Sequence, residues 1–354
     1  MPGGLGILPI FHRGYDERGR IMKWNRLVSA GALALVLAAP AAAEAEAVIP
    51  EEGERLSDAR TSDLERVDGL QPVPVAENVY AIIGSIEGRT YENHGLTMNL
   101  GIIVTDDGVV LVDSGPSRAF GEMLEEAIAG ITDKPVTHVI GIGSQDHRWM
   151  ADDYFAEQGA ELVTLERTAE TRREFTERHM ERLSGILDDR FDDTRAVVTD
   201  NPLEGDRHRL EIGGVGMQLE FWGDAHFPGD AVLYLPEEDV IFTGDMVYLD
   251  RMLGVHPWSN PVEWLEAVET LEALDPAVVV PGHGDLGDMD RVRADTGNYL
   301  RYLNEGVARA IEDWMDMSET VDGLADAPEF EHLEHFENWH RTNINRTYLF
   351  MEAM

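Results

Sequence analysis

Three short segments in the second half of the chain carry residues that can bind a metal ion. They are residues 225–230, 242–245 and 281–285, and each places a His or an Asp beside glycine or another small residue where an apolar strand is expected to end. The residues concerned are His226, Asp245 and His283, about 20 and about 40 residues apart along the chain. Two neutral imidazoles and one carboxylate are a common ligand set for Zn²⁺. The three segments together predict a metal site at one edge of a sheet.

These segments resemble the metallo-β-lactamase superfamily, in which the corresponding positions supply a ligand His, a bridging Asp and a last ligand His. The resemblance extends from about residue 75 to residue 285 and includes the apolar segments 100–104 and 109–115. It implies an α/β (α+β) fold, the αββα four-layer sandwich, with the metal along one edge. It also implies hydrolysis, since the metal acts as a Lewis acid and lowers the pKa of a bound water that attacks an ester, amide or similar bond.

The chain departs from this family at the first metal-binding motif, H-x-H-x-D-H, where it reads Gly-Ser-Gln-Asp-His-Arg. In an ungapped alignment, Gly143 and Gln145 replace the two leading His, His147 replaces the Asp, and Arg148 replaces the last His. A shift of one residue would instead align Asp146 and His147 with the Asp-His pair of the motif. We favour the ungapped alignment because the flanking apolar segments then keep their usual distances. Both alignments place His147 near the metal.

Too few candidate ligands remain for the two metal ions that five His and two Asp bind in a complete site of this superfamily. Three imidazoles and one carboxylate are enough for one tetrahedral zinc ion. We therefore expect one zinc, and the alternative is a metal-free pocket held by hydrogen bonds among the same residues. The candidate ligands are His147, His226, Asp245 and His283, with Gln145 and Asp146 as further metal-binding or pocket residues.

Three other residues are expected to support this site. Arg148 cannot bind a metal, because its guanidinium is always charged and has no lone pair to give. Its charge should repel a second zinc ion and could bind an anionic group of a ligand. Asp230 could orient His226 or contribute to such an anion-binding pocket. The resemblance implies that Asp113 is structural and orders the loop of the first motif through backbone amides.

Two functions of different kinds remain open from these residues. The first is an exported, metal-dependent hydrolase with one zinc ion, acting on an anionic small molecule. The second is a non-catalytic periplasmic accessory or binding protein that has kept the fold and lost the two-metal site. The metal content of the purified protein distinguishes the two functions.

The N-terminal 43 residues have the pattern of an extension followed by a secretory signal peptide. Lys23 and Arg26 precede an apolar run at residues 27–40, and three alanines follow at 41–43 as a cleavage site. We therefore expect export, to the periplasm, and no stable membrane anchor after cleavage. Residues 44–72 are acidic, lack an apolar period and are expected to form a flexible lead-in.

The composition argues against nucleic acid and anionic membranes as partners. The 354 residues carry a formal net charge of −40 and contain no cysteine. Acidic residues spread along the whole chain repel nucleic acid and anionic membranes, so a small-molecule substrate is the expected partner. Without disulfides, the stability of an exported protein of this size must come from its hydrophobic core.

Alternating strands and helices are expected to position the site. Apolar patterns and turn residues predict a metallo-β-lactamase-like domain at residues 73–286 and a C-terminal helical extension at 287–354. Strands are expected at 75–84, 96–105, 108–113, 135–140, 160–165, 231–235, 240–242 and 277–280, with a hairpin at 210–223. Helices are expected at 116–131, 149–158, 168–187, 261–274, 291–315 and 336–354.

Overall fold

The computed structural model describes residues 69–354. The expected signal peptide at 1–43 and residues 44–68 of the expected lead-in lie outside the described residues. Within residues 69–354, no helix combines the length and the apolar character needed to cross a bilayer.

The first sheet contains six strands in sequence order. Strands β1 to β4 pair antiparallel with their neighbours, and β4, β5 and β6 pair parallel, so β4, β5 and β6 end at the same edge. All four residues of β4 are buried, as expected for a strand covered on both faces. The bounds are β1 Pro72–Ala76, β2 Val79–Ile82, β3 Leu100–Val104, β4 Val109–Val112, β5 Val136–Gly141 and β6 Glu161–Thr164.

The second sheet contains five strands in the order β11-β10-β9-β8-β7. Strand β10 pairs antiparallel with β9 and parallel with β11, and all nine of its residues are buried. The pairing of β10 with β11 shifts register after Phe242 and again after Gly244, just where β10 reaches the candidate ligand Asp245. The bounds are β7 Arg207–Ile212, β8 Val215–Glu220, β9 Val232–Leu235, β10 Val240–Tyr248 and β11 Val278–His283.

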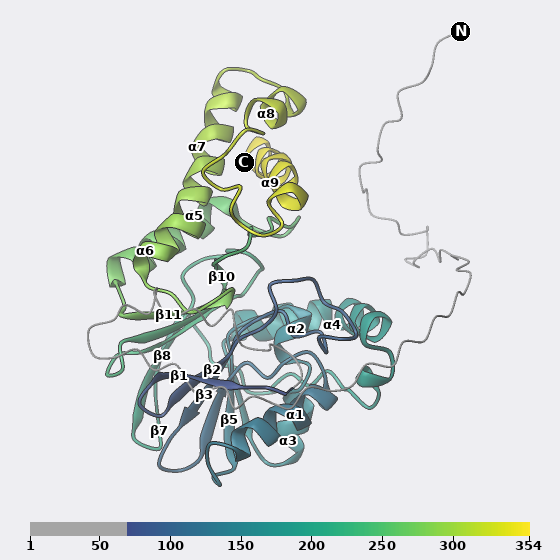
Figure 1. Ribbon diagram of the computed structural model, residues 1–354, viewed down its shortest axis with the longest axis vertical. Helices are drawn as coiled ribbons and strands as arrows, with labels where there is room; N and C mark the ends of the chain where they lie inside the picture. The colour runs from purple at the N-terminus through teal and green to yellow at the C-terminus, as the bar shows by residue number, and fades with distance from the viewer. Residues whose placement is uncertain (1–68) are drawn as a thin grey trace, which may run out of the picture. The chain divides into compact units, whose positions relative to one another are not determined.

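Three hydrophobic cores show that helices and sheets form four layers, the αββα sandwich. The middle core joins the two sheets and includes Val110 and Ile140 of the first sheet and Leu233 and Val280 of the second. On the outer face of the first sheet, α1 (Arg118–Ala129) and α3 (Asp152–Glu157) pack against β3, β4 and β5. On the outer face of the second sheet, α5 (Pro261–Leu274) packs against β10 (Figure 1).

Local capping explains where two of the helices begin. Asn260 caps α5 by accepting a hydrogen bond from the backbone N–H of Glu263 at 3.0 Å, and Pro261 occupies the first turn, as the sequence predicts. Helix α1 begins at Arg118, two residues later than expected, and its cap is Ser117, whose hydroxyl accepts from the N–H of Phe120.

Three expected elements are divided in the structure. The strand expected at 75–84 is the pair β1 and β2, because Asn78 adopts a positive φ of 59° and turns the chain. The helix expected at 149–158 is two short helices, α2 (Asp146–Trp149) and α3. The helix expected at 291–315 is α6 (Met289–Arg291), a π-helical segment at Val292–Gly297 and α7 (Asn298–Glu312).

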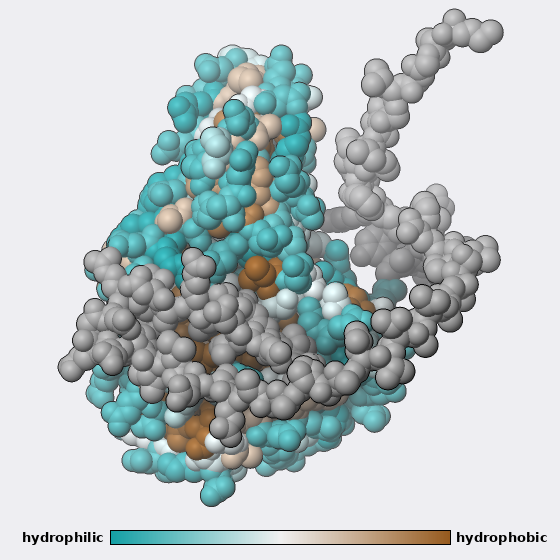
Figure 2. Space-filling view, viewed as in Figure 1, coloured by the Kyte–Doolittle hydropathy of each residue, from teal (hydrophilic) through white to brown (hydrophobic). Residues whose placement is uncertain are grey.

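The C-terminal helices α7, α8 (Met317–Gly323) and α9 (Phe336–Glu352) share one hydrophobic core with α5 and β10. A buried polar chain also joins α7 to α9, in which Tyr299 contacts His340 at 3.0 Å and accepts from Asn343 at 3.1 Å. Hydrophilic side chains cover most of the visible surface of this region (Figure 2). The division of the chain at residue 286 stays a prediction.

The remaining helix, α4 (Glu166–Leu187), packs against α2.

Asn99 holds together the segments that lead to the candidate site. Its buried side chain accepts a hydrogen bond from the N–H of Gly84 at 2.9 Å and donates to the carbonyls of Pro281 and Gly284, both at 2.9 Å. These two carbonyls flank His283 at the end of β11. One amide side chain therefore fixes β11 to the loop that follows β2.

We predict that Asn99→Ala lowers the free energy of unfolding by about 3 kcal/mol, because three buried backbone groups lose a partner at about 1 kcal/mol or more each. Urea unfolding followed by circular dichroism measures the change. Asn201→Ala, in an exposed loop, is the matched control and should change the stability by less than about 0.5 kcal/mol. Equal stabilities of the two variants would contradict this role of Asn99.

Candidate metal centre

Three of the candidate ligands come from α2, β10 and β11 and lie close together. His147 lies in α2, Asp245 lies within β10, and His283 is the last residue of β11. The approach of β11 to β10 requires Gly282, because a Cβ atom there would lie 2.4 Å from the carbonyl oxygen of Gly244. Small residues beside the ligands therefore allow the two strands to bring Asp245 and His283 together.

The three side chains form a compact, buried group. One ligand atom from each of His147, Asp245 and His283 lies within 4.8 Å of the others. His147 Nε2 lies 3.5 Å from Asp245 Oδ2, and His283 Nε2 lies 3.0 Å from Asp245 Oδ1. His147 thus faces Asp245, which is the orientation that the ungapped alignment predicts. His226, the fourth candidate, is not part of this group.

The hydrogen bonding of His283 leaves its Nε2 able to bind a metal ion. Its Nδ1 lies in hydrogen-bonding contact with the carbonyl oxygen of Thr97, which can only accept, so Nδ1 carries the proton. Burial lowers the pKa of His283 to about 4 in spite of the neighbouring Asp245, so the ring is neutral at pH 7. The lone pair of Nε2 then faces a carboxylate oxygen. A metal ion between the two atoms would relieve this repulsion, and a His that donates its other N–H to a carbonyl is the usual metal-binding arrangement.

His147 has two proton arrangements with opposite consequences. Its Nδ1 lies 3.2 Å from Asp146 Oδ1, and Arg89 Nη2 contacts both of these atoms. If Nδ1–H donates to Asp146, Nε2 has a free lone pair directed toward Asp245 Oδ2. If Nδ1 instead accepts from Arg89, Nε2 carries the proton and cannot bind a metal. His147 Nε2 and Asp245 Oδ2 are both buried and have no hydrogen-bond partner among the described residues.

Arg148 is buried between two carboxylates. Its Nη1 donates to Asp113 Oδ2 at 2.7 Å and its Nη2 donates to Asp245 Oδ1 at 2.5 Å. Burial disfavours the charge of Asp245, but Arg148 and His283 hold the pKa of this carboxyl well below its usual range. The charge of Arg148 is thus already compensated by two carboxylates, one on each terminal nitrogen. This geometry does not favour the expectation that Arg148 binds a substrate anion.

Arg148 also fills the space that a leading His of the motif would need. A Cβ atom at Gly143 would lie 1.9 Å from Cδ of Arg148. No side chain larger than hydrogen fits at position 143 while Arg148 keeps this conformation. The loss of the His at 143 and the gain of Arg148 are therefore two parts of one structural change.

The two supporting aspartates act on backbone amides. Asp113 Oδ1 accepts from the N–H groups of Ile142 and Gly143 at 2.9 and 3.2 Å, the loop-ordering contact that the family resemblance implies. Asp230 accepts from the N–H groups of Ser144 and Phe227, both at 3.1 Å. It therefore ties the first-motif loop to the His226 loop, and no contact with the His226 ring is seen.

His226 lies beside the metal-binding group in an aromatic cluster. Its ring centroid is 4.9 Å from that of His256 and 5.3 Å from that of Trp264. Its Nε2 lies 3.2 Å from the hydroxyl of Tyr248, whose ring stacks on His283 at 4.6 Å. Tyr248 thus lies between His226 and His283. The motif around His226 does not reveal this tyrosine, because its contacts depend on the register shift in β10.

Gln145 and Asp146 surround the group without belonging to it. Gln145 is buried directly before α2, and its backbone carbonyl accepts from the N–H of Arg148 at 3.1 Å. Asp146 pairs with Arg89 at 2.9 Å and with Arg182 at 3.6 Å. Neither arginine was predicted to lie near the site, because nothing in their local sequence links them to it.

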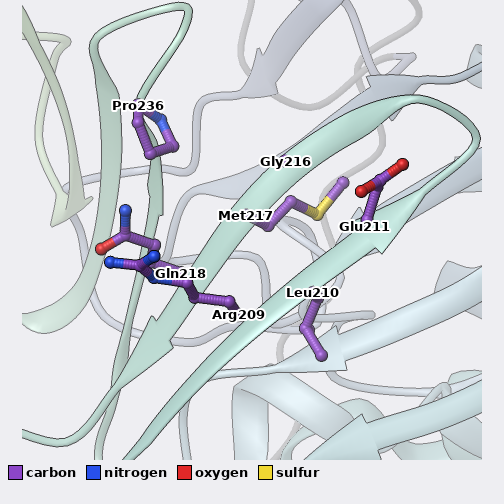
Figure 3. Close-up of a pocket in the computed structure, with 7 residues that line it drawn as sticks. All are labelled: Arg209, Leu210, Glu211, Gly216, Met217, Gln218 and Pro236. Atoms are coloured by element: carbon purple, nitrogen blue, oxygen red, sulfur yellow. The ribbon is translucent and has the colours of Figure 1, made fainter.

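A groove of about 380 Å³ lies elsewhere in the structure, on the β7–β8 hairpin (Figure 3). Its lining contains none of the candidate ligands, and it includes the charged residues Arg209 and Glu211. It therefore carries no argument about the metal centre.

Comparison with known proteins agrees with this geometry. A family model described as the metallo-beta-lactamase superfamily matches residues 148–283. Metallo-beta-lactamase IND-1 of Chryseobacterium indologenes is 23% identical over 218 residues, which cover 60% of this chain and 81% of that protein. The alpha subunit of 2,4-dinitroanisole O-demethylase of Nocardioides sp. (strain JS1661) is 26% identical over 183 residues, half of each chain.

Solved structures share the fold. A metallo-beta-lactamase from Pontibacter korlensis aligns with a TM-score of 0.54 and 24% identity, covering 66% of this chain and 99% of that one. The sec-alkylsulfatase Pisa1 from Pseudomonas sp. aligns with a TM-score of 0.63 and 16% identity, covering 79% of this chain and 50% of that one. This chain thus spans only about half the length of the demethylase subunit and of the alkylsulfatase. The sandwich, the motif order and these matches together support the metallo-β-lactamase superfamily, whose members are mostly hydrolases and typically bind zinc.

Proposed function

We propose that the protein is an exported, periplasmic hydrolase that uses a single zinc ion to cleave an ester, amide or similar bond in an anionic small molecule. The observation that carries this proposal is the buried group of His147, Asp245 and His283, whose possible ligand atoms lie within 4.8 Å of one another. The lone pair of His283 Nε2 faces a carboxylate, and His147 Nε2 and Asp245 Oδ2 are buried without partners. A cation bound between these three groups would be more favourable than their direct contact with one another.

The three residues would hold the zinc as a tripod of two imidazoles and one carboxylate. Three protein ligands are typical of catalytic zinc sites, because the fourth position remains open to water or substrate. Zinc bound there would act as a Lewis acid and lower the pKa of a water molecule toward neutrality. Burial, followed by the charge of Arg89, holds the pKa of His147 well below its usual range, so this ring stays neutral and able to bind a metal at pH 7.

Arg148 would take the electrostatic place of a second metal ion. Its guanidinium neutralises part of the charge of Asp245 through a hydrogen bond of 2.5 Å. A second zinc ion a few ångströms from this fixed charge would be repelled by several kcal/mol in a partly dry pocket. Asp245 is thus shared between one metal and one arginine, which supports a single zinc.

The second candidate function, a non-catalytic accessory or binding protein, is favoured by the other proton arrangement of His147. If Arg89 donates to Nδ1 of His147, the proton on Nε2 lies between His147 and Asp245 and closes the site. The pocket would then be held without metal by Arg89, Arg148 and their carboxylate partners. Metal content decides between the two functions.

We predict that the protein, purified without added metal and then dialysed against zinc, holds one zinc per chain. His283→Ala should weaken zinc binding by at least tenfold, because it removes one of three ligands, and His332→Ala, at a half-exposed position outside the group, should not. Elemental analysis and competition with a chromophoric chelator give the stoichiometry and affinity. Two tightly bound zinc ions, or no zinc in the folded protein, would each refute the proposal.

We also predict that Arg148→Ala destabilises the fold by about 3–5 kcal/mol, because it removes the nearest cation from two buried carboxylates. The guanidinium of Arg148 is paired with both Asp113 and Asp245, and alanine can replace neither contact. Arg209→Ala, an exposed arginine on β7, is the control. Urea unfolding measures both variants, and equal stabilities would show that the buried pairs have no net effect.

A further inference from the structure

Three of the outer edges of the two sheets are blocked or paired within residues 69–354. Strand β1 carries two prolines, which have no N–H to donate, and its pairing with β2 shifts register. At the end of β6, Leu165 forms a parallel bridge with Leu203. Beside β11, Val279 and Gly287 exchange backbone hydrogen bonds of 2.8 and 3.0 Å. The remaining edge is strand β7.

Strand β7 has a regular backbone whose alternate N–H and C=O groups face away from its sheet. All of Arg207–Ile212 pairs with β8 without a register shift. The carbonyl of Asp206, the preceding residue, accepts from the N–H of Phe221 at 2.8 Å and therefore faces the β8 side. Because these groups alternate in direction along an antiparallel strand, every second residue after Asp206 also faces β8, and the others face outward. The outward-facing residues are Arg207, Arg209 and Glu211.

Two of the outward-facing residues carry charges that no neighbour compensates. Within the described part of the chain, neither Arg209 nor Glu211 forms an ion pair or a side-chain hydrogen bond, whereas Arg207 pairs with Glu220 at 3.6 Å. On the other face of the strand, the half-buried Leu210 packs at the margin of the core between the sheets. An edge with opposite charges on one face and a half-exposed apolar side chain on the other is complementary to a second copy of itself.

We propose that β7 is a dimerisation edge, at which two copies of this chain pair their β7 strands antiparallel about a two-fold axis at Leu210. In this register, Arg209 of each copy lies opposite Glu211 of the other, and both residues have their backbone groups directed at the partner strand. Opposite charges in such cross-strand pairs are stabilising. A register shifted by one residue in each copy would place Arg209 opposite Arg209, which is destabilising.

The surface beside this edge has room for the side chains of the second copy. A groove of about 380 Å³ lies on the β7–β8 hairpin and is lined by both Arg209 and Glu211 (Figure 3). Gly216 pairs with Glu211, and a Cβ atom at Gly216 would have no atom within 4 Å. The long side chain of Arg209 from the second copy can therefore lie over Glu211. The pairing ends at Gly213, whose carbonyl already accepts from the N–H of Asp106.

Sedimentation velocity over a concentration series up to about 100 μM, in salt that screens the net charge of −40, tests for the dimer. The unmodified protein should show a reversible monomer–dimer equilibrium. Glu211→Arg should weaken it at least tenfold, because it places two arginines opposite each other, and adding Arg209→Glu to the same chain should restore it. Glu161→Arg makes the same charge change on the exposed face of β6 and should have no effect.

A single introduced cysteine tests the register, because the chain contains none of its own. Leu210→Cys places two thiols opposite each other on the two-fold axis, where Cα atoms about 4.5 Å apart permit a disulfide. Mild oxidation should therefore yield a covalent dimer. His208→Cys is the control: its two copies would lie about 13 Å apart along the strands and should stay unlinked.

The proposal is supported by a dimer that Glu211→Arg weakens, that the double exchange restores and that Leu210→Cys links. A monomer at every concentration overturns it, and this is the result expected if another segment of the chain covers β7. A dimer that Glu211→Arg leaves unchanged, or one that His208→Cys links in preference to Leu210→Cys, also overturns it. Because Arg209 would act only between copies, Arg209→Ala remains a stability control when unfolding is measured on dilute, monomeric protein.

Discussion

The guanidinium of Arg148, buried between the carboxylates of Asp113 and Asp245, is the interaction on which the organisation of the site depends. Asp113 holds the loop after β5, and Asp245 belongs to β10, so this arginine joins the two sheets at the edge where the ligands collect. A buried cation with two anionic partners is costly to desolvate, and the arrangement is stable only while all three members remain. The positions of the candidate metal ligands thus depend on how the two sheets of the sandwich pack together.

This constraint explains why several positions of the site differ from the family pattern together. Arg148 packs against the Cα of Gly143, so a His cannot be restored there by one substitution. Its hydrogen bond occupies one oxygen of Asp245 and leaves the other directed toward His147. His226 is then free to join Tyr248, His256 and Trp264 in an aromatic cluster. The result is one group of candidate metal ligands where the complete pattern of the family provides two metal sites.

The sequence predicted the parts of this structure that depend on local patterns. Helix α5 has the predicted bounds because Asn260 and Pro261 define its start within one turn. The strands that carry Asp245 and His283 follow from their apolar runs and the glycines beside the ligands. The sandwich itself was predicted from the order of the three motifs, and the comparisons confirm it.

Features that depend on distant contacts could not be predicted in this way. The turn at Asn78 is one example, since its positive φ divides an otherwise continuous apolar segment. Arg148 was placed near the metal, but its two partners lie 35 and 97 residues away in the chain. His226 contacts Tyr248, which comes from β10, 22 residues away, and the arginines around Asp146 come from a loop and from α4. Such contacts are decided by tertiary packing, which no short motif records.

Anomalous diffraction at the zinc absorption edge, from crystals grown with zinc, tests the central claim most directly. The account predicts one strong peak per chain, within about 2.2 Å of His147 Nε2, of a carboxylate oxygen of Asp245 and of His283 Nε2, with Arg148 still bound to Asp113. A second strong peak beside His226, or the absence of any peak between these three residues, would contradict it.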